Sequence, residues 1–185
     1  MPVPSFSNVA VGDKITAANW NQFVVASQQF LLGPPECIAT NSDGTSVPDS
    51  TYLVIPFTSE TCDTGVSWDG AMHDNITLNT RIKITTAGRY DIEGRCAWAA
   101  TANGSRRIHI RRNAGGNYSN GTMVDAFVWG STPSTADVGC FEFMRATATF
   151  AVGEYIEMFL YQTSGSALVL NASFPTWMRA RLVGS

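Results

Sequence analysis

The chain has 185 residues, of which 44% are hydrophobic and only 15% are charged, and its formal net charge at pH 7 is -3. This length supports one sizeable domain with an appendage, and the apolar content supports a real core. The small net charge gives no support to a nucleic-acid partner, and no stretch is long enough to span a membrane.

Charge is distributed unevenly along the chain. Residues 15–80 contain no Lys or Arg but seven acidic residues, whereas eleven of the twelve basic residues lie from Arg81 onward. Two interpretations stay open. Acidic and basic surfaces could meet between identical subunits, or the two halves could neutralise each other within one domain.

The first predicted element is a short amphipathic helix near the N-terminus. Thr16 is a suitable N-cap, Gly33 is a natural stop, and Pro34 and Pro35 forbid continuation. A single helix with an aromatic stripe cannot bury that stripe by itself. We therefore expect it to pack on the following domain, on its own copies in an oligomer, or on another protein. The predicted docking residues are Trp20, Phe23, Val24, Phe30 and Leu31.

Everything after Pro35 is predicted to form strands separated by turns. Alternation with a period of two is clear in "YIEMFLYQ", where Ile156, Met158 and Leu160 share one face. Asn-Gly and Gly-Gly pairs mark turns between the strands. About ten short strands without intervening helices indicate an all-β fold, an antiparallel two-sheet sandwich or jelly roll. The predicted strands are 36–40, 52–58, 76–85, 88–99, 105–113, 122–129, 139–152, 155–163, 167–171 and 176–183.

The predicted strand 105–113 carries four arginines and a histidine, which raises the question of a binding site. Alternation places Arg107, His109 and Arg111 on one face, and Arg106 and Arg112 on the other. The cations therefore do not form one patch, and a nucleic-acid site is disfavoured. We expect a buried face rimmed by cations, with at least one arginine meeting an acidic residue, for instance from residues 36–74 of a neighbouring subunit.

No motif for enzyme chemistry is present. A nucleophile needs a histidine nearby, and only His73 and His109 exist in the chain. The loop with Trp68, Asp69, His73 and Asp74 could hold a cation, but it lacks the regular spacing of a calcium loop. The sequence therefore predicts a protein that is not an enzyme and that has no cofactor and no metal.

The four cysteines also lack the spacing of a zinc or redox site, since no two of them form a C-x-x-C pair. Cys96 and Cys140 lie within apolar strand patterns, which favours small buried thiols. Cys37 and Cys62 could form a disulfide, and the sequence leaves that open.

Three stretches resemble C1q/TNF-like jelly-roll domains. In "RIKITTAGRYDIEGRCAWAATANGSRRIHIRRNAG", a strand ending in Thr-Ala-Gly precedes a long alternating strand with a tryptophan, an Asn-Gly turn and a basic strand. "FEFMRATATFAVGEYIEMFLYQTSGSALVL" has a strand, an Ala-Val-Gly turn and an amphipathic strand, and "WMRARLVG" is similar to the last strand of such domains. The resemblance covers residues 36–185 and implies a homotrimer, because these domains pack three jelly rolls around a three-fold axis.

A fourth stretch, "VAVGDKITAANWNQFV", resembles a segment that precedes C1q-like domains in virion proteins of tailed bacteriophages. The combination implies a structural virion protein on the surface of the capsid or tail. Residues 1–35 would be an arm that docks on the major capsid protein or another virion protein, and residues 36–185 would be an exposed knob. The start of the chain lacks the pattern of a signal peptide, which disfavours a secreted member. Head decoration, head fibre and tail appendage all stay open.

Two sets of residues follow from this interpretation. Aromatic residues on both faces of the strands predict burial by the partner sheet on one side and by a neighbouring subunit on the other. The predicted trimer-interface residues are Arg107, Arg111, Phe141, Phe143, Tyr155, Phe159 and Tyr161. The alternative function is a tail-associated protein that binds a receptor or host-surface glycan, with Trp68, Tyr118 and Trp129 as aromatic platforms for sugars.

Overall fold

The computed structural model describes residues 16–20, 24, 28, 31, 33–64, 70–99, 104–129 and 141–184. The N-terminal part of this set contains α1 (Ala17–Trp20), in which the Trp20 N–H donates to the Thr16 carbonyl at 2.9 Å. The remainder of the predicted helix falls largely outside the described residues. No helix in the described ranges is long and apolar enough to cross a membrane.

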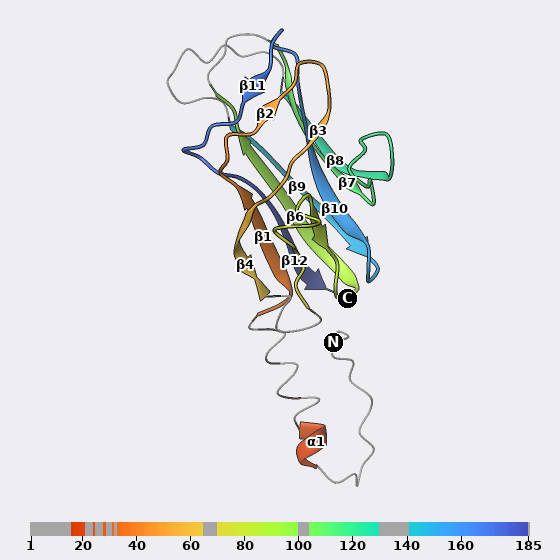
Figure 1. The fold of residues 1–185 in the computed structure, drawn as a ribbon. Coiled ribbons are helices and arrows are strands. Elements are labelled where there is room, and N and C mark those ends of the chain that lie inside the picture. Colours follow the sequence, from red (N-terminus) through yellow and green to blue (C-terminus); the bar gives the residue numbers. More distant parts are fainter. Residues whose placement is uncertain are drawn as a thin grey trace.

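Two antiparallel five-stranded sheets form a sandwich, as the sequence predicted (Figure 1). The first sheet has the order β4-β1-β12-β6-β9, and the second has the order β3-β10-β7-β8 with β5 also paired to β10. A third, two-stranded sheet joins β11 to β2. The strands of the first sheet are β4 (Ser59–Asp63), β1 (Glu36–Asn41), β12 (Thr176–Gly184), β6 (Gly88–Ala97) and β9 (Phe141–Phe150). Those of the other two are β3 (Leu53–Val54), β10 (Tyr155–Gln162), β7 (Arg106–Arg112), β8 (Thr122–Trp129), β5 (Arg81–Lys83), β11 (Leu168–Val169) and β2 (Ser46–Val47).

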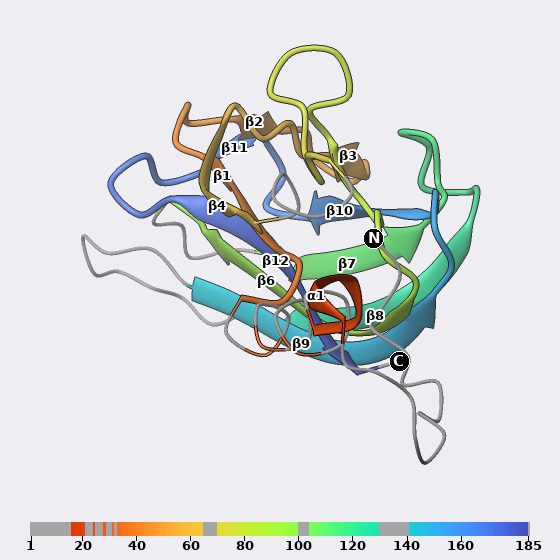
Figure 2. The ribbon, with the colours of Figure 1, turned by 90° about the horizontal axis from the view of Figure 1, so that it is seen from below.

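The core lies between the two sheets, which wrap around one interior when seen from below (Figure 2). Alternation along each strand sends every second side chain inward, and burying such an apolar side chain contributes about 1.5–3 kcal/mol. The largest fully buried side chains are Ile55, Phe57, Met72, Ile82, Ile84, Tyr90, Ile92, Trp98, Ile108, Ile110, Ile156 and Phe159. All of these except Phe159 belong to the continuous core.

Strand boundaries are confirmed where alternation is strong and wrong where it is interrupted. The predicted strand 76–85 is shortened to β5, because the Asp74 carboxylate accepts the N–H groups of Ile76 and Thr77 and turns the chain there. The polar edge strand β4 was not predicted. Its sequence, SETCD, shows no alternation of apolar and polar residues, and the strand forms by pairing with β1.

The three cysteines in the described ranges form no disulfide with one another. Cys37, Cys62 and Cys96 are free thiols, and Cys37 and Cys96 are buried. The strand register places Cys62 opposite Ile38 and not opposite Cys37, so the two thiols do not face each other across the sheet. The disulfide that the sequence left open is therefore absent.

A matched pair of glycines tests the loop between β7 and β8. Both have positive φ, +76° at Gly116 and +67° at Gly121. A Cβ at Gly121 would lie 2.1 Å from the Arg112 carbonyl oxygen, whereas one at Gly116 would have no atom within 4 Å. We expect Gly121→Ala to lose about 2–4 kcal/mol of unfolding free energy and Gly116→Ala about 1 kcal/mol, measured by urea denaturation. Equal losses of unfolding free energy in the two variants would contradict the close approach of Gly121 to the Arg112 carbonyl oxygen.

Candidate self-association face

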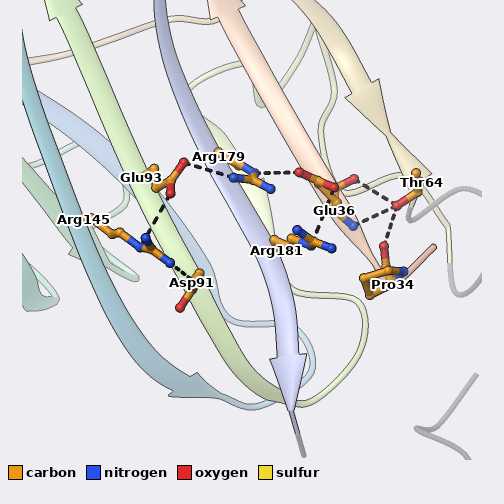
Figure 3. A network of polar contacts seen from close by, with 8 residues as sticks. All are labelled: Pro34, Glu36, Thr64, Asp91, Glu93, Arg145, Arg179 and Arg181. Carbon is orange, nitrogen blue, oxygen red and sulfur yellow. Dashed lines mark hydrogen bonds and ion pairs between the residues drawn. The ribbon is translucent and has the colours of Figure 1, made fainter. Parts of the chain in front are cut away.

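The outward face of the first sheet carries a row of charges of alternating sign (Figure 3). Arg179 on β12 lies between two carboxylates, with Nε 2.5 Å from Glu36 Oε1 and Nη1 3.1 Å from Glu93 Oε2. Arg145 on β9 continues the row, with Nε 3.6 Å from Glu93 Oε1 and Nη2 2.7 Å from Asp91 Oδ2. The register explains this order, because Arg179 is paired with Glu93, and Glu93 with Arg145.

The same network fixes the start of β1. The Glu36 N–H donates to Thr64 Oγ1 at 2.9 Å, and the Thr64 hydroxyl donates to the Pro34 carbonyl at 2.8 Å (Figure 3). Arg181 approaches from β12, with its Nε 3.9 Å from Glu36 Oε2. The point where residues 1–35 join the sandwich is therefore tied to this face of the first sheet.

Hydrogen bonds also lower the pKa of one carboxyl group on this face, that of Asp91. The pKa of Asp91 lies below its ordinary value, first because of the hydrogen bond from Arg145 and then because of the one from Thr147. A carboxylate with a lowered folded-state pKa stabilises the fold at neutral pH and loses this effect in acid. Exposed ion pairs of this kind contribute little each, about 0–1 kcal/mol, so the row orients side chains more than it stabilises the sheet.

An apolar patch lies on the same face. Phe143 of β9 is 49% exposed, and its ring centroid is 6.1 Å from that of Trp177 on β12 at an interplanar angle of 64°. Trp177 is partly buried, and an exposed aromatic ring beside a partly buried one is the kind of surface that a protein partner covers. The face therefore combines an apolar patch with a fixed pattern of charges.

The predicted interface residues are not brought together on one surface. Phe143 lies on the outward face of the first sheet. Phe141 belongs to the same strand, although its side chain lies outside the described set. The other five lie on the outward side of the second sheet, across the sandwich: Arg107, Arg111, Tyr155, Phe159 and Tyr161. Their position at a subunit interface stays a prediction.

Around Phe159, the outward side of the second sheet is covered by the chain itself. Phe159 is 1% exposed, and Tyr118 from the loop after β7 packs edge-on against it with a centroid distance of 5.7 Å. Tyr118 in turn stacks on Tyr52 at 3.4 Å and 3°. The burial of Phe159 therefore does not require a neighbouring subunit. Tyr118 is also the only suggested sugar platform whose side chain is described, and Tyr52 occupies one face of its ring.

The basic strand divides as its alternation predicted. Arg106, Ile108 and Ile110 are buried inward, whereas Arg107 and Arg111 lie outward, over the rings of Tyr161 (5.0 Å) and Tyr118 (4.7 Å). These contacts are cation–π interactions within the chain.

The predicted meeting of an arginine with an acid is confirmed for Arg112, whose Nη1 lies 3.6 Å from Glu154 Oε1. Its acidic partner belongs to the same chain and not to residues 36–74. His109, between the outward arginines, is buried, and its pKa is lowered to about 4 by burial first and then by Arg107 and Arg111. The imidazole is therefore neutral at pH 7.

The suggested cation loop does not assemble a metal site in the described part of the chain. His73 places Nδ1 2.6 Å from the Arg81 carbonyl and Nε2 3.2 Å from the Phe57 carbonyl, so the backbone occupies both ring nitrogens. Asp74 is used by its own turn. No group of three or more His, Cys, Asp or Glu side chains among the described residues is placed to hold a metal. Trp68 and Asp69 lie outside the described ranges.

The predicted docking helix is described only at a few positions. Trp20 and Leu31 are exposed in the single chain, and Val24 is partly buried. Phe23 and Phe30 lie outside the described residues. The docking role of these five residues stays a prediction.

Sequence reasoning missed a buried carboxyl group, Glu142 on β9. It is 1% exposed and shares the inward face with Met144 and Phe150. The three residues are an even number of positions apart, so the alternation of β9 places Glu142 inward. The Cys96 thiol donates to Glu142 Oε2 at 3.5 Å. Burial raises the pKa of Glu142 to about 7, and the neighbouring Trp98, Cys96 and Arg106 side chains oppose this effect only in part.

Glu142→Gln tests this environment. Because the folded-state pKa lies above the unfolded-state value, ionisation of Glu142 destabilises the fold as the pH rises from about 4.5 to about 7. At pH 8 we expect the unfolding free energy of the Glu142→Gln variant to exceed that of the parent by about 2–3 kcal/mol. Near pH 4 the two unfolding free energies should be equal. Denaturation at both pH values, with the part-exposed Glu154→Gln as control, measures this. A difference independent of pH would contradict the raised pKa.

Comparisons with known proteins support the fold. Neither a protein-family model nor a curated protein matches the chain in sequence. The globular domain of zebrafish complement 1qA is similar in structure, with a TM-score of 0.53, 9% identity, and coverage of 80% of this chain and 97% of that domain. Murine APRIL (TM-score 0.55, 10% identity, coverage 80% and 98%) and Eiger TNF from S. frugiperda (0.51, 12%, 82% and 95%) are similar as well. The chain therefore has the jelly-roll fold of C1q and TNF domains.

Proposed function

We propose that this protein is a non-enzymatic structural protein of a tailed-bacteriophage virion. Its jelly roll forms a homotrimer through the outward face of the first sheet, and residues 1–35 attach the trimer to the capsid or another virion protein. The observation that carries the association is the exposed Phe143–Trp177 patch beside the ordered row of charges. The phage role is supported by the resemblance of residues 9–24 to segments of virion proteins.

The two outward faces of the sandwich differ in the way that this proposal requires. On the second sheet the chain's own loop covers Phe159, whereas on the first sheet Phe143 remains half exposed. A half-exposed aromatic side chain gains free energy when a partner removes it from water. Fixed charges next to it favour one orientation of that partner over others. We choose a trimer over other oligomers because the chain has the fold of C1q and TNF domains. The sequence resemblance to these domains implies packing around a three-fold axis.

The path of the chain suits an arm at one end of such a trimer. β1 starts beside the end of β12, since Glu36 is paired with Arg181. The three arms of a symmetric trimer would therefore leave from the same end of the knob. The exposure of Trp20 and Leu31 supports a partner for this arm beyond the single chain.

Substitution of Phe143 tests the association face. The parent should sediment as three chains of 20.0 kDa, about 60 kDa in total, at micromolar concentration. Phe143→Asp places a charge in the apolar patch and should weaken association at least about tenfold. Met123→Asp is the matched control, because Met123 is exposed on the opposite side of the sandwich. A monomeric parent, or equal effects of the two variants, would contradict the proposed face.

Removal of residues 1–33 tests the attachment. The truncated protein should remain a trimer, because the jelly roll carries the association face, and it should no longer bind virions. Co-sedimentation with purified particles measures this, with the full chain as the positive control. A truncated trimer that still binds particles would refute the anchoring role of the arm.

A further inference from the structure

A buried carboxyl group lies directly beneath the candidate self-association face. Glu142 and Phe143 are neighbours at the start of β9, where alternation points Glu142 into the core and Phe143 outward. Phe143 is opposite Arg95 of β6, and Arg95 is in turn opposite Trp177 of β12. The pairing of β9 with β6 therefore sets the positions of both the buried carboxyl group and the aromatic patch.

The immediate surroundings of Glu142 favour its neutral form. The side chain is 1% exposed, and its Oε1 atom accepts no hydrogen bond from the described residues. Its Oε2 atom lies 3.5 Å from the Cys96 sulfur, and a thiol is a weak donor. A buried carboxylate without strong donors is unfavourable, whereas the neutral acid loses much less free energy on burial.

The charged groups near Glu142 do not compensate for this burial. The side chains that face it are the Cys96 thiol of β6, the Trp98 indole that follows β6 and the Arg106 guanidinium of β7. Glu142 forms no ion pair with Arg106 or any other described cation. The one titratable group of β8, Asp125, accepts the N–H of the next residue. Burial therefore dominates and raises the pKa of Glu142 to about 7.

The start of β9 is the part of the first sheet through which this carboxyl group can reach water. β9 lies at the edge of the sheet, and β6 is its one hydrogen-bonded neighbour among the described strands. The end of an edge strand opens at a lower free energy than a strand paired on both sides. Because Phe143 directly follows Glu142, such an opening also moves Phe143 away from Trp177 and breaks the aromatic patch.

We propose that Glu142 is a proton-dependent switch of the self-association face, an inference that rests on the proposed function. The neutral acid keeps the start of β9 on β6 and Phe143 beside Trp177. The carboxylate releases the strand end and disperses the patch.

The sign of the pH dependence follows from the two states of the subunit. In the trimer a neighbouring subunit covers Phe143, so β9 stays in place and the carboxyl group stays buried. Opening in the free subunit returns the pKa of Glu142 towards its ordinary value of 4.5. Association is therefore linked to proton uptake, and the trimer should weaken as the pH rises from about 4.5 to about 7.

Sedimentation of the full chain at pH 5 and pH 8 tests the link to association. The affinity of the parent should fall at least about tenfold per subunit, the effect of a difference of one unit between the pKa values of Glu142 in the two states. Glu142→Gln imitates the neutral acid and should associate equally at both pH values. Glu154→Gln, which replaces a part-exposed carboxylate, should keep the pH dependence of the parent. Equal affinities of the parent at the two pH values, or an unchanged pH dependence in Glu142→Gln, would overturn the proposal.

Amide hydrogen exchange of residues 142–145 tests the switch without a trimer. It is measured in a Phe143→Ser background, which disfavours association without adding a charge. The protection factors, corrected for the intrinsic effect of pH, should fall at least about tenfold from pH 5 to pH 8 and stay constant when Glu142→Gln is added. Constant protection in the Phe143→Ser protein would refute the switch. A monomeric parent whose Phe143→Ser variant shows the expected fall would refute the proposed association and support the switch.

Discussion

The carboxylate of Glu157 is the constraint on which the outward side of the second sheet depends. Its position in β10 points away from the core, yet it is fully buried. It accepts hydrogen bonds from Arg81 Nε at 3.0 Å, from the Thr80 hydroxyl at 3.0 Å and from the Gly116 N–H at 3.1 Å. An unpaired buried carboxylate costs several kcal/mol, so these partners must come together when the chain folds. One side chain thereby joins β5, β10 and the loop after β7.

This junction makes the two outward faces of the sandwich unequal. The loop held by Glu157 lays Tyr118 over Phe159. On the first sheet, no described loop covers Phe143 in this way. In the association that we propose, a partner therefore gains more free energy from covering the first sheet than from covering the second.

Periodicity in the sequence predicted the long strands because alternation is a local property. β7, β8, β10 and β12 appear within one or two residues of their predicted ranges. The contacts that cover the second sheet could not be predicted in this way, since Gly116 and Glu157 lie 41 residues apart in the chain. The aromatic residues on the outward face of β10 led to the prediction that a neighbouring subunit covers Phe159, whereas Tyr118 of the same chain packs against it. Alternation does not say which chain provides such a cover. The burial of Glu142 was missed because its charge obscured the inward phase of β9.

The acidic and basic segments of the chain neutralise each other in part within one chain. Glu36, from the acidic segment, pairs with Arg179 and lies near Arg181, both from the basic segment. Arg179 is already shared between Glu36 and Glu93, so a carboxylate from another subunit would add little to its stabilisation. In the trimer that we propose, the attraction between subunits then comes mainly from covering Phe143 and Trp177. The row of charges acts on the orientation of the partner, because a misplaced neighbour would oppose like charges across the face.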